Sequence, residues 1–517
     1  YASALRLITE KNPLPFITGT ICAHNCMTKC MRNYYDEPVN IRATKLVAAE
    51  RGYDDYMAKI KAPVPVTDGR KVAVIGGGPT GMAAAYFVGR AGIPVTIFER
   101  SGVLGGVVRQ VIPAFRISDD AIDHDVALMF KMGVEVKLNT EAPSVAELKA
   151  QGYTHIFFAV GAWKAGRLDI PGNVVPVIGW LKDMKAGKDV SLGHVAVVGG
   201  GNTAMDAARA ALRAGAQSST LVYRRTKKYM PADAEELEMA IADGVEFLEL
   251  VAPVEQKDGK LVCEKMKLGD PDEKGRRKPV PTGEMVEIPC DTVVSAVGEK
   301  VESEVFTRNG ITVDEKGIPA FKTNVEGVYA GGDAMRGPAT VVEGIADAQY
   351  FANAVIGEAH KFAIPGKAVA TREEAIAKKG ILCESAKCEG DRCLTCNVVC
   401  QVCADVCPNR ANVVIELPDG RQQILHVDRM CNECGNCAVF CPYDSAPYRD
   451  KFTLFQTREG FDESVNNQGF LPLGGKKVLV RLNGKVFEAD LDAKNDLPAD
   501  IEVFIWTVLT KYAYLMG

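Results

Sequence analysis

Apolar and polar positions change their spacing several times along the chain, and the clearest pattern covers residues 70–100, RKVAVIGGGPTGMAAAYFVGRAGIPVTIFER. An apolar, β-branched run at 72–75 predicts a buried strand. A glycine-rich turn and a helix of small residues follow, and a second apolar run ends at Glu99. Strand, glycine turn, helix and strand in this order are typical of the first half of a dinucleotide-binding α/β domain.

The glycines of this segment have separate mechanical roles. Gly76 permits the tight turn, Gly78 lets the backbone approach a pyrophosphate, and Gly81 allows close packing of the helix on the strand. The helix N-terminus then faces the phosphates, and the Glu99 carboxylate can accept hydrogen bonds from ribose hydroxyls. The further candidate contacts of this site are Pro79, Thr80, Arg100, Gly106 and Gly161.

The pattern recurs at residues 194–225, HVAVVGGGNTAMDAARAALRAGAQSSTLVYRR. The second strand now ends in Arg224 and Arg225, with no acidic residue. A carboxylate there would repel a 2′-phosphate, whereas a guanidinium binds one. The second site is therefore expected to prefer NADPH to NADH. Its candidate contacts are Gly199, Gly201, Asn202, Thr203, Ala204, Arg224 and Arg225.

The first pattern resumes at residues 325–355, where a predicted strand ends in Gly331-Gly332-Asp333 and an apolar helix begins near Thr340. In flavoproteins with two dinucleotide sites, this arrangement places an acidic side chain on the flavin ribityl and pyrophosphate groups and a helix N-terminus beneath the isoalloxazine. We therefore predict an NADPH domain inserted into an FAD domain. The candidate FAD contacts in this part are Gly332, Asp333, Thr340 and Val341.

The cysteines gather at two places in the sequence. Of sixteen cysteines, three lie at Cys22, Cys26 and Cys30, and eleven lie between residues 383 and 441. Such clusters in a large chain without a signal peptide indicate metal sites in a reducing, cytoplasmic compartment rather than a disulfide framework. Cys263 and Cys290 lie in β-like stretches, where a buried, inert thiol is expected.

The second cysteine group follows the spacing of bacterial ferredoxins with two [4Fe-4S] clusters. Cys431-x2-Cys434-x2-Cys437-x3-Cys441-Pro supplies three thiolates to one cluster and the fourth to the other. The group that ends at Cys407-Pro matches it with one inserted residue. A zinc ribbon is the alternative, and two Cys-x3-Cys-Pro endings favour iron–sulfur. The two predicted ligand sets are Cys396, Cys400, Cys403 and Cys441, and Cys407, Cys431, Cys434 and Cys437.

Cys393 remains outside both ligand sets, with Cys383 and Cys388 upstream of it. Two interpretations stay open, either spare thiols near a cluster or a further site that uses all three. Beyond the cysteines, KKVLVRLNGKVFEADLD alternates apolar and polar positions around a turn-like Asn-Gly at 483–484. This pattern predicts a hairpin in a small β cap without chemistry of its own, followed by a short aromatic segment.

Composition excludes some classes of protein. The chain has 517 residues, of which 47% are hydrophobic and 25% charged, enough for several domains with cores. A net charge of −5 argues against a general nucleic-acid binder. The run Val72–Gly89 is marginally long enough for a membrane span, but glycine and proline fill its middle, so we predict no membrane segment. The chain starts at Tyr1 inside a helix-like run, and we expect further polypeptide upstream.

Several motifs together resemble the small subunit of glutamate synthase and its relatives. They are NPLPFITGTICAHNC, PVNI, GGGPTG, GGGNTAMD, VYRR, MPA and GVYAGGD, within about residues 1–357. With the ferredoxin-like tail, the chain is most similar to the C-terminal half of large flavoproteins named as selenate reductases. The resemblance implies FAD as the electron hub, NADPH as donor or acceptor, and an N-terminal helical segment that binds iron–sulfur clusters.

The resemblance also implies roles for the N-terminal cysteines. Cys22, Cys26 and Cys30 match the second half of the family's cysteine pattern, and the first half would lie upstream of Tyr1. Three thiolates do not complete a four-cysteine cluster, so the number and partners of these clusters stay open. The family often has a Gln or Glu ligand where this chain has Lys45, a poor ligand as an ammonium.

The fold class predicted is α/β, with two interleaved Rossmann-like domains, a helical iron–sulfur segment and a two-cluster ferredoxin-like domain. The predicted boundaries are 1–67 for the truncated helical segment, 68–189 and 298–357 for the two parts of the FAD domain, 190–297 for the NADPH domain, 358–392 for a connector, 393–450 for the ferredoxin-like domain and 451–517 for the β cap.

No catalytic side chain is predicted. Neither nucleotide domain contains a Cys-x-x-Cys dithiol, and no Ser-His-Asp or paired-carboxylate pattern appears. We therefore predict an NADPH-dependent oxidoreductase that passes electrons between NADPH, FAD and [4Fe-4S] clusters and a terminal site in an upstream region or partner subunit, in either direction. The resemblance implies molybdenum-hydroxylase-type partners and purine breakdown, although no residue here reads a purine. The alternatives are a ferredoxin–NADP(H) oxidoreductase and a structural electron-transfer subunit.

Overall fold

The computed structural model describes residues 1–28, 30–34, 37–188, 190, 192–271, 277–357, 389–393, 401–441, 445–464, 467–493 and 495–516. The chain divides into two compact units. Unit 1 comprises Tyr1–Ala23 and Lys45–Lys361, and unit 2 comprises His24–Thr44 and Phe362–Gly517. Across the described ranges, no helix is long and apolar enough to cross a membrane.

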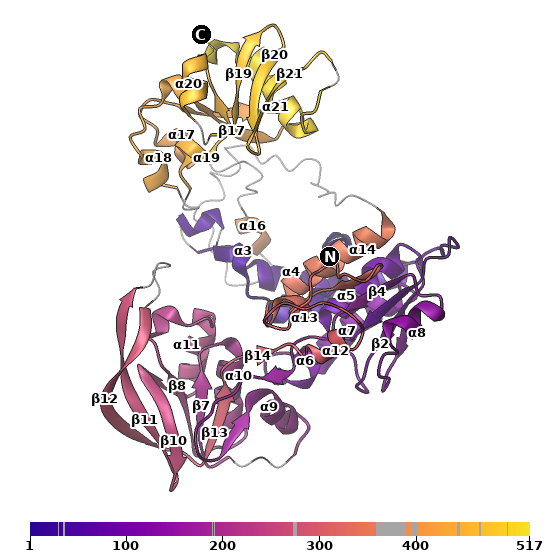
Figure 1. Ribbon diagram of the computed structural model, residues 1–517, viewed down its shortest axis with the longest axis vertical. Coiled ribbons are helices and arrows are strands. Elements are labelled where there is room, and N and C mark those ends of the chain that lie inside the picture. Colours follow the sequence, from indigo (N-terminus) through magenta and orange to yellow (C-terminus); the bar gives the residue numbers. More distant parts are fainter. Residues whose placement is uncertain are drawn as a thin grey trace. The chain divides into compact units, whose positions relative to one another are not determined.

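The first α/β fold of unit 1 is built on a five-stranded parallel sheet in the order β15-β4-β1-β2-β3. Figure 1 labels β2 and β4 of this sheet. β1 pairs with β2 on one side and β4 on the other, so its carboxyl end lies in the middle of one sheet edge. In open α/β sheets this edge holds the ligand. The strands are β1 Val72–Ile75, β2 Val95–Phe98, β3 Glu135–Lys137, β4 His155–Phe158 and β15 Val328–Ala330.

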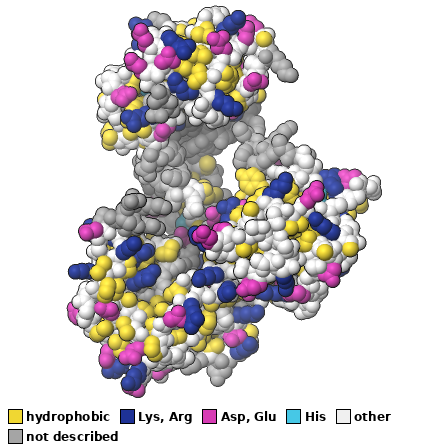
Figure 2. Space-filling model, viewed as in Figure 1, with side chains coloured by type: hydrophobic (Ala, Val, Ile, Leu, Met, Phe, Trp, Pro, Cys, Tyr) yellow, Lys and Arg dark blue, Asp and Glu magenta, His cyan; other side chains and the backbone are white. Residues whose placement is uncertain are grey.

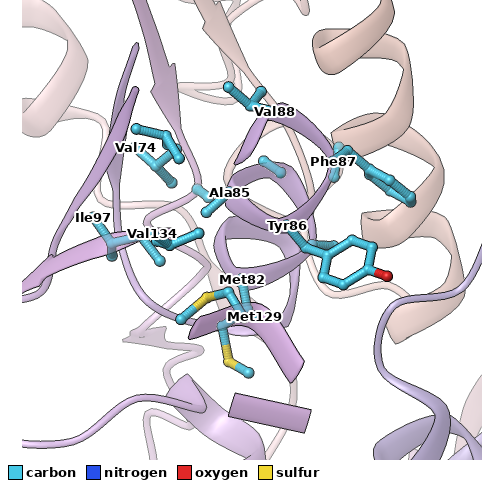
Figure 3. Close-up of a cluster of buried hydrophobic side chains, with 14 of the residues drawn as sticks. Val74, Met82, Ala85, Tyr86, Phe87, Val88, Ile97, Met129 and Val134 are labelled. Atoms are coloured by element: carbon cyan, nitrogen blue, oxygen red, sulfur yellow. The ribbon is translucent and has the colours of Figure 1, made fainter. Parts of the chain in front are cut away.

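The core of this fold forms where α5 (Pro79–Arg90) packs on the sheet. Figure 3 shows Met82 and Ala85 of α5 among Val74, Ile97 and Val134 from the strand side, and all five side chains are buried. Small residues in α5 allow this close approach, as the sequence pattern indicated. The other helices are α6 Gly106–Gln110, α7 Asp119–Phe130, α8 Val145–Ala150, α12 Glu304–Thr307, α13 Asp333–Arg336 and α14 Val341–Ile356.

The N-terminal helices dock on the same fold. Both carboxylate oxygens of Asp125 on α7 accept hydrogen bonds, from the backbone N–H groups of Phe16 (3.1 Å) and Ile17 (2.8 Å). These donors lie in the first turn of α2, where helix N–H groups have no partner within the helix. Burial raises the pKa of Asp125 well above its usual value, against the lowering effect of these amides. The helices are α1 Ala2–Thr9, α2 Pro15–Ile21 and α4 Ile41–Lys59.

The second α/β fold repeats the first. Its parallel sheet has the order β6-β13-β7-β8-β9, so β7 occupies the central place that β1 has in the first sheet. The strands are β6 Val174–Pro176, β7 His194–Gly199, β8 Ser218–Tyr223, β9 Glu246–Glu249 and β13 Thr292–Ala296. The helices are α9 Val177–Lys185, α10 Asn202–Arg213 and α11 Ala234–Ala242, with a 3₁₀ turn η2 at Lys227–Tyr229.

Two short strands join the folds. β5 (Lys164–Ala165) and β14 (Glu299–Lys300) pair antiparallel, and each carries the chain across once. An antiparallel sheet lies beside β13 in sequence, formed by β10 Val251–Lys257, β11 Lys260–Pro271 and β12 Arg277–Pro289. Cys263 and Cys290 lie here in a buried apolar cluster, and burial raises their pKa values to about 12 and about 11. Neither thiol is therefore a thiolate at neutral pH.

Unit 2 contains a six-stranded sheet in the order β16-β17-β18-β19-β20-β21. The strands are β16 Asn412–Glu416, β17 Gln422–Val427, β18 Thr453–Leu454, β19 Gly469–Gly474, β20 Lys477–Leu482 and β21 Lys485–Asp490. The helices and 3₁₀ turns are α3 Asn25–Thr28, η1 Met31–Tyr34, α16 Glu389–Arg392, α17 Val402–Asp405, η3 Asp428–Met430, α18 Asn436–Val439, α19 Pro447–Asp450, α20 Arg458–Glu463, α21 Ala499–Lys511 and η4 Ala513–Leu515.

The predicted hairpin is confirmed at β20 and β21, where Leu482 pairs with Lys485 across the two-residue turn. Both turn residues have positive φ, 51° at Asn483 and 77° at Gly484, as the hairpin turn requires. The hairpin is part of the larger sheet, because β18 pairs with β17 and joins the C-terminal strands to the strands of the cysteine region. The aromatic segment forms α21, whose Phe504 and Ile505 enter the sheet's core.

Candidate functional site

A cavity of about 640 Å³ opens in unit 1, and residues of both α/β folds line it. It lies at the carboxyl ends of the strands, at the edge where ligands of such sheets bind. Thirteen of the twenty residues predicted to contact FAD or NADPH line it, namely Gly76, Gly78, Pro79, Thr80, Glu99, Arg100, Gly106, Gly161, Asn202, Thr203, Asp333, Thr340 and Val341. The other seven are Gly81, Gly199, Gly201, Ala204, Arg224, Arg225 and Gly332.

The three glycines of the first turn differ in how much space surrounds them. Gly76 has φ +104°, and a Cβ there would lie 2.4 Å from the carbonyl oxygen of Ala159. A Cβ on Gly81 would lie 1.9 Å from the carbonyl oxygen of Gly76. At Gly78 the nearest atom would be 3.8 Å away. Gly76 and Gly81 are therefore required by the fold, whereas the backbone at Gly78 is bare toward the cavity and fits a pyrophosphate that approaches it closely.

Glu99 is held at the cavity by the backbone. One carboxylate oxygen accepts from Gly77 N–H and the other from Ser101 N–H, both at 2.7 Å. The side chain is buried and lies at the end of β2. Each oxygen keeps a lone pair for a further donor, which is the property that recognition of a ribose hydroxyl needs.

The second glycine turn shows the same division. A Cβ on Gly199 would lie 2.3 Å from the carbonyl oxygen of Ala296, while one on Gly201 would meet nothing within 4 Å. Ala204, at the place of Gly81, is fully buried under β7. The second turn therefore also offers a bare backbone at its middle glycine.

Arg224 and Arg225 lie at the end of β8, outside the cavity lining. Arg224 is exposed and Arg225 is half-buried. Within the described part of the chain, the Nε of Arg225 is buried with no hydrogen-bond acceptor. A buried donor without an acceptor is costly unless a ligand supplies one, and a 2′-phosphate has the matching chemistry.

Replacing both arginines with alanine is expected to raise the Kd for NADPH about 10²-fold, because hydrogen bonds to charged groups contribute about 1.5–3 kcal/mol each. Binding of NADH should change little. Equilibrium titration of both nucleotides checks this, with Lys260→Ala, an exposed lysine of β11, as control. Equal losses for the two nucleotides would contradict the assignment.

Asp333 faces the cavity from the start of α13, where its Oδ1 accepts from Ala339 N–H at 3.1 Å. Burial raises the pKa of Asp333 to about 6, with Glu299 and Glu343 adding to the effect. Gly332 lies behind it with φ +63°, where a Cβ would lie 2.3 Å from Thr80 Oγ1. The two parts of the first fold thus meet at the cavity, and Gly332 serves their packing.

Thr340 begins α14 in a capping box with Glu343. Its hydroxyl accepts from Glu343 N–H, and the Glu343 carboxylate accepts from Thr340 N–H. This fixes the helix N-terminus at the cavity edge, where its remaining N–H groups carry a partial positive charge.

Among the cavity-lining residues that sequence reasoning did not single out are Arg116, Trp163, Asp206 and Glu299. Cys22, predicted as an iron–sulfur ligand, also lines the cavity. Asp206 had a readable signal, since it replaces the alanine found at the same place in the first repeat. Burial raises the pKa of Asp206 to about 6, although the Arg116 guanidinium opposes this. Glu299 lies on the joining strand β14, and burial raises its pKa as well. Their positions depend on contacts between distant segments.

In unit 2 the structure brings together several of the predicted cluster ligands. Cys403 on α17 and Cys437 on α18 are buried against Ile424. Burial raises the pKa of the Cys431 thiol, and the neighbouring thiols of Cys407 and Cys437 raise it further. Backbone N–H groups donate to sulfur, Ala411 to Cys407 (3.2 Å) and Glu433 to Cys431 (3.3 Å). Cys407, Cys431 and Cys437, three members of one predicted ligand set, therefore lie near one another.

The remaining predicted cysteine ligands are either outside the described residues or at least partly exposed. Cys396 and Cys400, like Cys383 and Cys388, lie outside the described residues. Cys434 and Cys26 are exposed, and Cys30 and Cys441 are partly buried. Among the residues that the structure describes, no group of three or more His, Cys, Asp or Glu is close enough to hold a metal ion.

Cys393 lies next to a buried ion pair in unit 2. Arg392 binds the Glu389 carboxylate and donates to the carbonyl oxygen of Glu37, while Arg32 donates to the carbonyl oxygen of Arg392 at 2.9 Å. The segment that follows Cys30 and the segment that ends at Cys393 are therefore packed together. Lys45, where the family often has a Gln or Glu ligand, donates instead to Thr18 Oγ1 at 2.9 Å.

His426 is a buried histidine that the sequence patterns did not single out. Its Nδ1 lies 3.1 Å from Asn412 Oδ1, and Asn412 Nδ2 donates to the carbonyl oxygen of Cys403. Asn412 Oδ1 is an acceptor, so Nδ1 of the ring donates in this contact. Burial lowers its pKa to about 4. This chain of hydrogen bonds ties β17 to the cysteine-bearing turn.

We expect unit 2 to lose stability on acidification through this histidine. The pKa of His426 is lower in the folded chain than its value of about 6.5 in the unfolded chain, so the unfolded chain binds a proton first as the pH falls. The free energy of unfolding should therefore be highest above about pH 6.5 and should decrease by about 3 kcal/mol by about pH 4. Unfolding followed by Trp506, the single tryptophan of unit 2, measures it. In His426→Gln, which keeps a donor but does not titrate, the pH dependence should be shallower. Equal slopes in both proteins would refute the prediction.

Comparison with known proteins shows which family the chain belongs to. The pyridine nucleotide-disulphide oxidoreductase family model matches residues 70–348. The chain belongs to this family. The chain is also similar to the glutamate synthase [NADPH] small chain of Escherichia coli (strain K12). The two are 30% identical over 68% of this chain and 82% of that protein. The predicted resemblance to the glutamate synthase small subunit is therefore confirmed.

Two longer relatives add context. The chain is 40% identical to YgfK of Escherichia coli (strain K12), over its whole length and 53% of that protein. It is 36% identical to the NADP(+)-dependent formate dehydrogenase subunit beta of Moorella thermoacetica, over 67% of this chain and 55% of that protein. The chain thus spans about half the length of these two relatives.

Family membership establishes an NAD(P)H-dependent oxidoreductase that binds FAD and NADPH on two Rossmann-like folds. A redox dithiol is not found in the described residues of either fold. Their cysteines, Cys263 and Cys290, are both fully buried, free and far from thiolate form.

Proposed function

We propose that the chain passes electrons between NADPH, FAD and [4Fe-4S] clusters, and on to a terminal reductase or dehydrogenase site in another domain or subunit. The observation that carries the proposal is the shared cavity: Gly78 of the first fold and Asn202 of the second line the same space. Two cofactors held there would meet. This is the condition for transfer of a hydride without a carrier.

The residues of the first fold would hold FAD. Gly78 exposes backbone to the pyrophosphate, Glu99 accepts from the ribose, and Asp333 with the α14 N-terminus faces the flavin end. When bound, FAD takes up electrons in pairs and gives them up singly. The residues of the second fold, with Arg224 and Arg225, would hold NADPH.

Iron–sulfur clusters held by the cysteines would carry the single electrons onward. Cys22 lines the cavity, so one predicted iron–sulfur ligand would lie at the proposed flavin site. In unit 2 the buried thiols of Cys403 and Cys437, and the partly buried Cys407 and Cys431 near Cys437, support the two-cluster assignment on the spacing already given. The helical iron–sulfur segment, the ferredoxin-like domain and the boundaries given under Sequence analysis are part of this proposal, with two exceptions. β6 pairs with β13, so residues 174–185 go with the second fold, and β16 to β21 form one sheet across the limit at residue 450.

Partners belong to the proposal as well. The formate dehydrogenase relative is named a beta subunit, and the glutamate synthase relative is named a small chain, so both names indicate proteins with more than one chain. This supports a partner redox subunit or a further domain as the electron acceptor. The direction of flow between NADPH and that site is left to experiment.

Anaerobic mixing of the purified chain with NADPH tests the proposal. The flavin absorbance should bleach, and reduced-cluster signals should then appear in the electron paramagnetic resonance spectrum. Bleaching without cluster signals would leave a plain NADPH–flavin enzyme and overturn the onward transfer. Fast turnover with free ferredoxin by this chain alone would favour the ferredoxin–NADP(H) oxidoreductase instead.

A further inference from the structure

A segment of the first α/β fold is gripped by the second. Residues 112–119 lie between α6 and α7 of the first fold. Arg116, in this segment, binds Asp206 of α10 at 2.5 Å and Glu236 of α11 at 2.6 Å. One guanidinium thus ties two helices of the second fold to the first, and we call these three residues the latch.

The latch is built as a buried structure. The side chains of Arg116, Asp206 and Glu236 are only 14%, 8% and 6% exposed. Surface ion pairs contribute little to the free energy of unfolding. Breaking a buried pair costs more, because it leaves an unpaired charge in the interior. The two acids share one arginine and are approached by Arg209 of α10, at 3.8 Å from Glu236. The geometry is therefore strongly specified.

Two further contacts hold the same segment. Lys185 of α9 donates to the carbonyl oxygen of Ile112 at 2.7 Å. The ring of Phe115 lies under the guanidinium groups of Arg209 (5.0 Å) and Arg213 (4.5 Å). All three helices of the second fold therefore contact this one segment.

Nucleotide binding as such does not require the latch acid. Aligning the two glycine motifs places Gly201 on Gly78 and Ala204 on Gly81, so Asp206 falls on Ala83. Ala83 is fully buried in the first fold, which carries no charge there. The charge at Asp206 is thus an addition to the repeat, and its partner lies across the domain boundary.

The covalent connection cannot fix the two folds by itself. In the described part of the chain, the pair of β5 and β14, two residues each, joins them, and Gly166 and Gly298 flank this pair. Arg116 and Asp206 both line the shared cavity, so their contact lies at the wall of the space where the two cofactors would face each other.

We propose that Arg116 is a positioning residue for reduction of the flavin by NADPH: through Asp206 and Glu236 it sets the second fold, and the nucleotide it holds, against the first. The inference rests on the proposed binding of both cofactors in the shared cavity. Arg116 acts through the two acids and not on a reacting atom.

The test compares Arg116→Met, Arg116→Lys and Asp206→Asn with the parent, and with Arg6→Met, an exposed arginine of α1, as control. Flavin content, the Kd for NADPH, and the rate of flavin bleaching at saturating NADPH are measured. Amide hydrogen exchange of residues 112–118 is followed in the flavin-loaded protein without NADPH.

Arg116→Met is expected to keep its flavin and its Kd for NADPH, while bleaching slows by about tenfold to 10²-fold, the effect of a small misplacement of reacting groups. Exchange at 112–118 should rise. Arg116→Lys should recover part of the rate, and the double variant with Asp206→Asn should be no slower than the worse single variant, because both remove one interaction.

An unchanged bleaching rate in Arg116→Met and Asp206→Asn, with faster exchange at 112–118, would overturn the proposal and leave the latch a purely stabilising contact. Weaker NADPH binding with an unchanged bleaching rate at saturating NADPH would overturn the proposal too. Failure of the parent protein to bleach with NADPH would instead count against the proposed function, while the exchange result would still report on the latch.

Discussion

Gly78→Ala is expected to abolish tight FAD binding while the apoprotein remains as stable as the parent. The backbone at Gly78 has φ −75°, which alanine adopts freely, and a Cβ there meets no atom closer than 3.8 Å. The methyl group would occupy only the space that the pyrophosphate needs. Losing one or two hydrogen bonds to a charged group costs about 1.5–3 kcal/mol each, so the Kd for FAD should rise about 10²-fold or more.

Gly201→Ala is the matched control in the second fold. Its backbone is likewise extended, at φ −97°, and its Cβ meets nothing within 4 Å. This variant should retain FAD but bind NADPH about 10²-fold more weakly. Flavin content after gel filtration and nucleotide titration separate the two results. The assignment of the two folds fails if Gly78→Ala keeps its FAD, or if the two variants lose the same cofactor.

Cys431→Ala is expected to remove about four iron atoms per chain, one whole cluster, since a [4Fe-4S] cluster needs its four thiolates. Cys431 lies beside Cys407 and Cys437, which belong to the same predicted set. Iron and acid-labile sulfide are measured on anaerobically purified protein. Cys263→Ala serves as the control, because this thiol is buried among apolar side chains in unit 1 and should leave the iron content unchanged.

An unchanged iron content in Cys431→Ala would refute the ferredoxin-like assignment, and zinc in place of iron would favour the ribbon alternative. The same analysis on Cys393→Ala addresses the two interpretations of that residue. A loss of iron there would favour a further site, whereas no loss would leave it a spare thiol.

The sequence predicted the nucleotide folds well because their signals are local. Gly76, Gly78 and Gly81 each serve a contact within one strand–turn–helix unit, and the strand at 72–75 appeared where the apolar run placed it. The order of both sheets follows from the repeat. The Asn-Gly hairpin was likewise readable, because two adjacent positive φ angles demand such residues.

The rest of the site depends on contacts between distant segments. Arg116 lies ninety residues from Asp206, and nothing in the FRISDD segment around it marks it as an interdomain residue. Glu299 comes to Asp333 only because β14 crosses back from the second fold. The C-terminal hairpin joined the sheet of the cysteine region through the two-residue strand β18, too short to leave a periodic signal.

Charged side chains of both signs are interspersed on the face of the molecule shown in Figure 2. The chain's net charge of −5 argues against a general nucleic-acid binder, as the composition indicated.

Anaerobic titration of the purified chain with NADPH, with flavin and iron quantified in the same sample, tests electron transfer from NADPH through FAD to the clusters. We expect one FAD and at least about eight irons per chain. We also expect an uptake of about four electrons, two by flavin and one by each of two clusters, with NADPH effective at lower concentration than NADH. Fewer than about eight irons, or an end point at two electrons, would contradict this electron transfer.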